Sequence, residues 1–160
     1  MKPKTALAAC AFFGRHIVPL LLAASIPAGL RYYQMDQFAS RPAAFSWTLD
    51  ILVLVGRLAL VCVILGNGAL LAGYRTARRL LQTPRQESNA AFSRAAERLS
   101  SEVRNYLADA AVYVFGALAA NLLIGAVASS LPMQLLLKNL TVIPFTLVFL
   151  ILLSRRLLKA

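Results

Sequence analysis

The sequence predicts an all-α integral membrane protein, with four transmembrane helices and a cytoplasmic amphipathic helix between the second and the third. Its 160 residues are 59% hydrophobic and 14% charged, whereas soluble domains average about 45–50% apolar and about 25% charged residues. Two long stretches, 58–74 and 110–137, contain no charged residue. A helix needs about 20 apolar residues to cross the hydrocarbon core of a bilayer, so these runs favour membrane spans.

The four spans are expected at residues 12–33, 48–74, 108–129 and 133–154, and together they make one domain. Pro19 and Pro27 fall inside the first span, where proline is tolerated because neighbouring groups satisfy the freed carbonyls. The stretch 129–134 (SSLPMQ) predicts a turn between the last two spans, and Pro144 predicts a kink in the fourth. Four spans place both termini on the same side.

The distribution of lysine and arginine predicts the orientation, because cytoplasmic segments carry an excess of these residues. One side holds Lys2, Lys4, Arg15, Arg75, Arg78, Arg79, Arg85, Arg94, Arg98, Arg104, Arg155, Arg156 and Lys159. The other side holds Arg31, Arg41, Lys138 and, at most, Arg57. We therefore expect a multi-pass protein of a bacterial-type inner membrane with cytoplasmic termini. Topology then explains the net charge of +11, and no nucleic-acid partner is expected.

An amphipathic helix is predicted over residues 84–107, in the cytoplasmic loop. The stretch 83–86 (TPRQ) has the form of a capping box with proline at the first helical position. Apolar residues then recur at steps of three and four from Phe92 to Leu107, and Arg98 and Glu102 form an i,i+4 pair. The nine residues 75–83 are too short to let this helix of about 36 Å rise upright. It should lie on the membrane surface or bend near 87–90.

The charge of this loop has two interpretations. In the first, the charge only fixes the topology, through attraction to anionic headgroups of about 1 kcal/mol per well-placed basic residue. Alternatively, the helix is a docking face for another membrane protein or for a second copy. The candidate contact residues, for headgroups or partner, are Arg75, Arg78, Arg79, Arg85, Phe92, Arg94, Arg98 and Leu99.

Polar residues inside the predicted spans are candidates for helix packing or for a transport pathway: Asp50, Arg57, Asn67, Asn121 and Lys138. If the second span is one helix, Asp50, Arg57, Gly68 and Arg75 lie on one face of it. Their spacings of 7, 11 and 7 residues bring each residue to within about 20° of the direction of the one before it around the helix axis. Arg57 is expected to extend to the outer interface or to pair with Asp50 or Asp36. A role in an ion or substrate pathway is the alternative.

Small residues predict close contacts between helices. They form the ridges Asn121–Gly125–Ser129 and Gly116–Ala120 in the third span, and Gly66–Gly68 with Ala69 and Gly73 in the second. A pocket around Asn67 and Asn121 is the alternative interpretation of the same pattern.

The residues that enzymes need are scarce in this sequence. His16 is its only histidine, Cys10 and Cys62 lie in apolar runs, and no phosphate-binding loop or nucleophile motif occurs. No catalytic residue, metal or cofactor is therefore expected, and Asp109 should form an ion pair at the inner end of the third span. We expect a non-catalytic inner-membrane subunit, assembly factor or regulator that docks partners through its basic amphipathic helix. The alternative is a small oligomeric channel or transporter lined by Arg57, Asn67 and Asn121.

Overall fold

The computed structural model describes residues 4–37, 43–82 and 85–158, and the regular structure in these ranges is helical. The helices are α1 (Lys4–Arg15), α2 (Ile17–Gln37), α3 (Ala43–Leu65), α4 (Leu70–Leu81), α5 (Arg85–Ser101), α6 (Val103–Val127), α7 (Leu131–Leu140) and α8 (Val142–Leu158). The expected capping box at 83–86, and the side chains of Asp36, Arg41 and Arg85, lie outside what is described.

Three helical stretches are long and apolar enough to cross a membrane: Trp47–Leu65, Val103–Val127 and Leu131–Leu158. Lys4–Arg15 and Ile17–Met35 would make a fourth if the two, which meet at 86°, count as one span. The prediction of an all-helical chain is thus confirmed, with three to four helices of membrane-spanning length.

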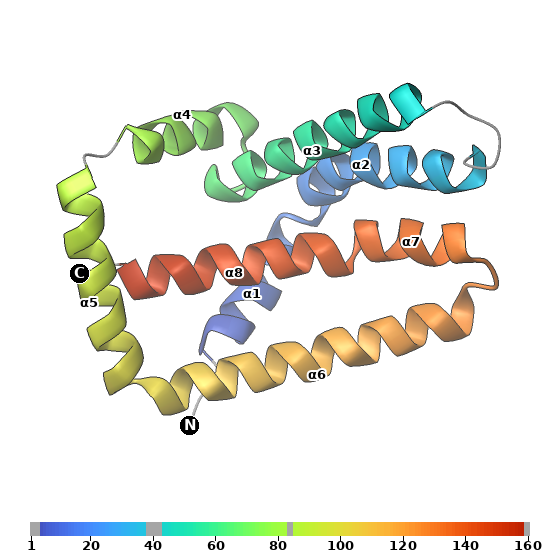
Figure 1. The fold of residues 1–160 in the computed structure, drawn as a ribbon. Coiled ribbons are helices and arrows are strands. Elements are labelled where there is room, and N and C mark those ends of the chain that lie inside the picture. Colours follow the sequence, from blue (N-terminus) through green and yellow to red (C-terminus); the bar gives the residue numbers. More distant parts are fainter. Residues whose placement is uncertain (1–3, 38–42, 83–84, 159–160) are drawn as a thin grey trace.

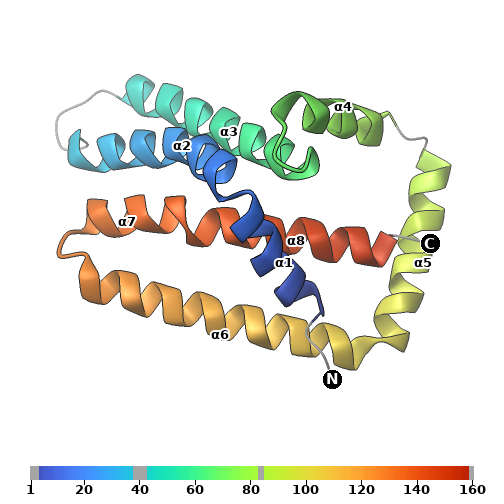
Figure 2. The same ribbon diagram turned by 180° about the vertical axis from the view of Figure 1, so that it is seen from behind.

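α2, α3, α6 and the consecutive helices α7 and α8 run side by side, whereas α1 and α5 cross them (Figures 1 and 2). α2 packs against α3 and α7, while α6 runs along the other side of α7 and α8. α5 lies across one end of the bundle, beside the C-terminal end of α8. α1 crosses obliquely from α6, past α8, to the start of α2.

The first expected span departs from a straight helix over 12–33. The chain bends sharply at His16, between α1 and α2. Pro19 has no N–H to donate to the carbonyl of Arg15, and its ring disfavours a continuous helix through this point. Pro19 instead occupies the first turn of α2, where a proline is tolerated, and Pro27 stays inside that helix.

The second expected span, over 48–74, is interrupted. α3 ends at Leu65, and α4 begins at Leu70. Asn67 has a φ of 52° and Gly68 a φ of 95°. The N–H of Gly68 donates to the carbonyl of Val63 at 2.8 Å, and that of Asn67 to Ile64 at 3.2 Å. This is the Schellman arrangement that ends helices, so Gly66–Asn67–Gly68 is a stop signal.

The glycines then let the first turn of α4 lie directly against the end of α3. A Cβ atom on Gly73 would overlap the carbonyl oxygen of Cys62, so only glycine allows this close approach. Because α3 has ended, Gly68 lies in the turn and Arg75 on α4. The expected common face of Asp50, Arg57, Gly68 and Arg75 is therefore not formed.

The remaining boundaries also shift. The expected amphipathic helix over 84–107 divides at Glu102, where α5 ends and α6 begins, so the expected span over 108–129 is the later part of α6. In the fourth span, expected over 133–154, the break falls at Thr141 between α7 and α8. Pro144 causes it in the same way as Pro19, since it cannot donate to the carbonyl of Leu140.

The buried apolar core lies where α1, α2, α3 and α8 meet. It contains Ala6, Ala9, Leu20, Ala24, Leu60, Val63, Ile64, Val148 and Phe149. Many larger apolar side chains point outward instead, including Phe115 and Leu122 of α6, which are 72% and 74% exposed. An apolar surface of this extent is typical of proteins that contact lipid or other proteins.

Candidate functional sites

A buried ion-pair cluster joins the two ends of the chain. Asp109 of α6 is fully buried, and its Oδ1 accepts the N–H groups of Thr5 at 2.9 Å and Ala6 at 3.1 Å. Its Oδ2 lies 2.9 Å from Nη1 of Arg156 on α8. The first N–H groups of a helix have no partner within it, so this carboxylate caps α1 and complements its dipole.

The guanidinium of Arg156 completes the cluster. Its Nη2 lies 2.7 Å from Oε2 of Glu102, its Nη1 donates to the hydroxyl of Thr5 at 3.1 Å, and it lies 4.8 Å from the centre of the Tyr106 ring. An ion pair for Asp109 was predicted, but its partner was not. Glu102 pairs with Arg156 rather than with Arg98, whose guanidinium donates to the Arg156 carbonyl at 3.4 Å. Residues near both termini thus meet beside the α5–α6 junction.

The candidate contact residues are spread over α4 and α5, at the same end of the bundle (Figure 1). Arg75, Arg78 and Arg79 are exposed on α4, and Arg94 is exposed on α5. Phe92 and Leu99 of α5 are 76% and 47% exposed. Arg98 differs from them, because it is half-buried and lines a cleft of about 450 Å³ with Lys4, Arg155 and Arg156.

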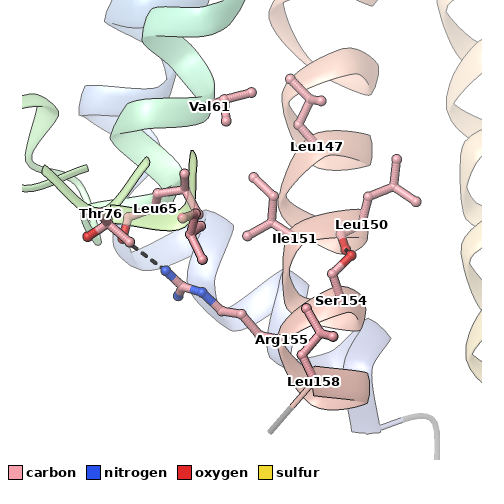
Figure 3. Close-up of a pocket in the computed structure, with 10 residues that line it drawn as sticks. Val61, Leu65, Thr76, Leu147, Leu150, Ile151, Ser154, Arg155 and Leu158 are labelled. Atoms are coloured by element: carbon pink, nitrogen blue, oxygen red, sulfur yellow. Dashed lines mark hydrogen bonds between the residues drawn. The ribbon is translucent and has the colours of Figure 1, made fainter. Parts of the chain in front are cut away.

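An apolar pocket of about 420 Å³ lies between α3, α4 and α8 (Figure 3). Val61, Leu147 and Ile151 line it, and Thr76 lies at its α4 side. Arg155 reaches from α8 to donate to the carbonyl of Leu65 at 2.9 Å. This carbonyl is in the last turn of α3, where carbonyls lack donors and a cation is favourable. Arg155 therefore ties α8 to the end of α3.

A second polar cluster lies near the opposite end of the bundle. Oδ1 of Asp50 lies 3.0 Å from Nη1 of Arg31 and accepts from Nε2 of Gln34 at 3.1 Å. Arg31 also donates to Oε1 of Gln34 at 2.8 Å. Asp50 therefore pairs with α2, and its pairing with Arg57, one of the possibilities considered for Arg57, is not formed.

Arg57 lies instead in a cavity of about 430 Å³ between α2, α3, α6 and α7. Arg31, Lys138, Asn121 and Asn139 line the same cavity. The Nε–H of Arg57 is buried and has no hydrogen-bond partner among the described residues. An unsatisfied buried donor costs about 1–3 kcal/mol, and more when it is charged. Three of the five predicted intramembrane polar residues, Arg57, Asn121 and Lys138, are thus brought together.

Asn67 does not join this group, because it lies in the turn between α3 and α4. The predicted pocket around Asn67 and Asn121 is therefore not formed. The small residues of α6 line a cavity instead of a close contact between helices. Gly116 and Ala120 line an apolar cavity of about 310 Å³ beside α8, and no atom lies within 4 Å of a Cβ built on Gly116 or Gly125. This ridge leaves space where close contact was expected.

Within the described ranges, no group of three or more His, Cys, Asp or Glu side chains could hold a metal ion. Comparison of the chain with protein-family models, with curated proteins and with solved structures found no match.

Proposed function

We propose that this chain is a four-span protein of a bacterial-type inner membrane, with cytoplasmic termini, that docks a partner protein through α5. In this proposal it is a non-catalytic subunit, assembly factor or regulator. The lengths and hydropathy of the helices support the membrane setting. The meeting of the termini at the arginine-rich end supports the orientation, since cytoplasmic segments are enriched in basic residues.

The observation that carries the docking function is the exposed stripe of α5. Ala91, Ala95 and Arg98 are half-buried, and α5 packs against α8. Phe92 and Leu99 are seven residues apart, so they lie within about 20° of each other on the helix, and both are exposed. A helix that packs through one stripe and exposes a second apolar stripe suits recognition by another protein. Arg94, which is exposed on the same helix, adds positive charge to α5.

Site-specific photo-crosslinking in intact membranes tests this function. A photoreactive phenylalanine is placed at Phe92 or, as the matched control, at Phe115 of α6, which is 72% exposed against 76% for Phe92. We expect the Phe92 probe to give one discrete protein adduct, whose identity mass spectrometry establishes, and the Phe115 probe to give lipid adducts. Lipid adducts alone from Phe92 would refute docking and favour a helix that only covers the membrane surface.

A small oligomeric channel or transporter is the second candidate function. The shared cavity of Arg57, Asn121 and Lys138 favours it. One observation argues against transport. The neighbouring cavity beside α8 is lined by mostly apolar residues, including Phe13, Tyr113 and Gly116, and an apolar lining suits a binding site better than a polar transport path. Anion flux in proteoliposomes that is lost in Arg57→Gln would establish transport.

A further inference from the structure

The cationic cavity between α2, α3, α6 and α7 has no part in the docking function. Arg31, Arg57 and Lys138 line it, and no described acidic residue does. Charged side chains within an apolar bundle are costly unless they are paired or hydrated, and they usually mark a functional site. The question is therefore which group supplies the missing negative charge.

The described carboxylates do not supply a negative charge to Arg57 or Lys138, two of the three cations that line the cavity. Asp50 pairs with Arg31, while Glu102 and Asp109 bind Arg156 at the other end of the bundle. In the part of the chain that is described, neither Arg57 nor Lys138 has an ion-pair partner, and the Nε–H of Arg57 is buried without an acceptor. The cavity thus presents two uncompensated positive charges together with the amide groups of Asn121 and Asn139.

An apolar space adjoins this cationic cavity. Val142 lines both the cationic cavity and the apolar cavity of about 310 Å³ between α6 and α8. Phe13, Tyr113 and Phe145 supply aromatic surface to the apolar part, and Gly116 and Ala120 keep it open. The two neighbouring cavities, one cationic and the other apolar, thus share Val142 in their walls.

We propose that these two cavities together bind an anionic amphiphile, with its phosphate or carboxylate headgroup at Arg57 and Lys138 and its hydrocarbon chain between α6 and α8. A guanidinium presents a fork of donors that matches phosphate and carboxylate oxygens, and an ammonium adds a point charge. Lys138 lies seven residues into α7, about 10 Å along the helix. A headgroup bound at Lys138 would therefore lie about 10 Å along α7 from the start of that helix.

Binding of dodecyl phosphate to the purified full chain, measured by native mass spectrometry from a non-ionic detergent, tests the proposal. Arg57→Gln/Lys138→Gln removes both charges, and Arg15→Gln/Arg104→Gln, at two exposed positions outside the candidate contact residues, is the charge-matched control. We expect the first variant to lose at least about tenfold in affinity, since hydrogen bonds to charged groups contribute factors of this size. The control variant should bind as the unchanged chain does.

A second variant keeps every charge. Gly116→Leu extends a side chain into the apolar cavity, where a Cβ meets no atom within 4 Å. It should weaken dodecyl phosphate binding severalfold and leave the binding of inorganic phosphate unchanged. Folding is preserved, because leucine is a better helix former than glycine.

Three results would overturn the proposal. Equal binding to all variants, or equal binding of dodecyltrimethylammonium, would mean unspecific adsorption. Inorganic phosphate that binds as tightly as dodecyl phosphate, with no effect of Gly116→Leu, would identify a site for free anions instead. The proposal does not rest on the docking function, so a failed crosslink at Phe92 leaves it standing.

Discussion

Replacement of Asp109 by alanine should destabilise the protein more than the loss of any other described carboxylate. The substitution removes an ion pair with Arg156 at 2.9 Å and the acceptor of two N–H groups at the start of α1. Because Asp109 is fully buried, Arg156 would keep a partly buried charge with only Glu102 as its ionic partner. Breaking a buried pair costs about 3–5 kcal/mol, which is two to nearly four orders of magnitude in the folded-to-unfolded ratio. Unfolding by SDS in mixed micelles, followed by circular dichroism, measures this loss.

Asp50→Ala is the matched control for this prediction. It breaks an Arg–Asp contact of similar length, 3.0 Å, but the two side chains are 37% and 46% exposed. Exposed pairs contribute about 0.2–1 kcal/mol. Asp109→Asn should fall between the two, since an amide oxygen can still accept from Thr5 and Ala6. If Asp109→Ala costs no more than Asp50→Ala, the cluster does not hold the ends of the chain together.

Two further predictions concern the turn between α3 and α4, with the same unfolding assay. Gly73→Ala should lower the free energy of unfolding by about 1–3 kcal/mol, the usual range for overpacking, because its Cβ would overlap the carbonyl oxygen of Cys62. The control Gly116→Ala, in open space, should be neutral or stabilising by up to about 1 kcal/mol. A similar loss of stability in both variants would contradict the close approach of α4 to α3. Asn67→Val should lower the free energy of unfolding by about 1–2 kcal/mol, because a φ of 52° disfavours a β-branched side chain. Asn67→Gly should be tolerated, and equal stability of the two variants would argue against the positive φ.

The polar sites were harder to predict than the helices, for reasons visible in particular residues. Asp109 was expected to form an ion pair, but its partner Arg156 is 47 residues away and one of several arginines at that end. Spacing along one helix cannot distinguish between them. A pair of Arg57 with Asp50 was one possibility that the spacing along a single helix left open, whereas the carboxylate pairs with Arg31 on the neighbouring α2.

The interruption of the second span had a signal in the sequence that was given the wrong meaning. Gly66–Asn67–Gly68 was interpreted as small residues for helix packing. The same residues can adopt positive φ, and two of them do so. The residues around this segment are apolar and uncharged, so hydropathy alone extends the helix through it. Only the hydrogen bonds to Val63 and Ile64 reveal where α3 ends.

The sequence by itself determined the helical class and the presence of apolar segments long enough to cross a membrane. These depend on composition and on local periodicity, which act within a few turns of one helix. The tertiary structure alone decided which charges meet, how closely α4 packs against the end of α3, and that Arg57, Lys138 and Asn121 share a cavity beside an apolar space. Those features depend on how four or more helices are placed relative to one another. The physical reason is that a buried charge is stabilised by the nearest opposite charge in space, at whatever distance along the chain.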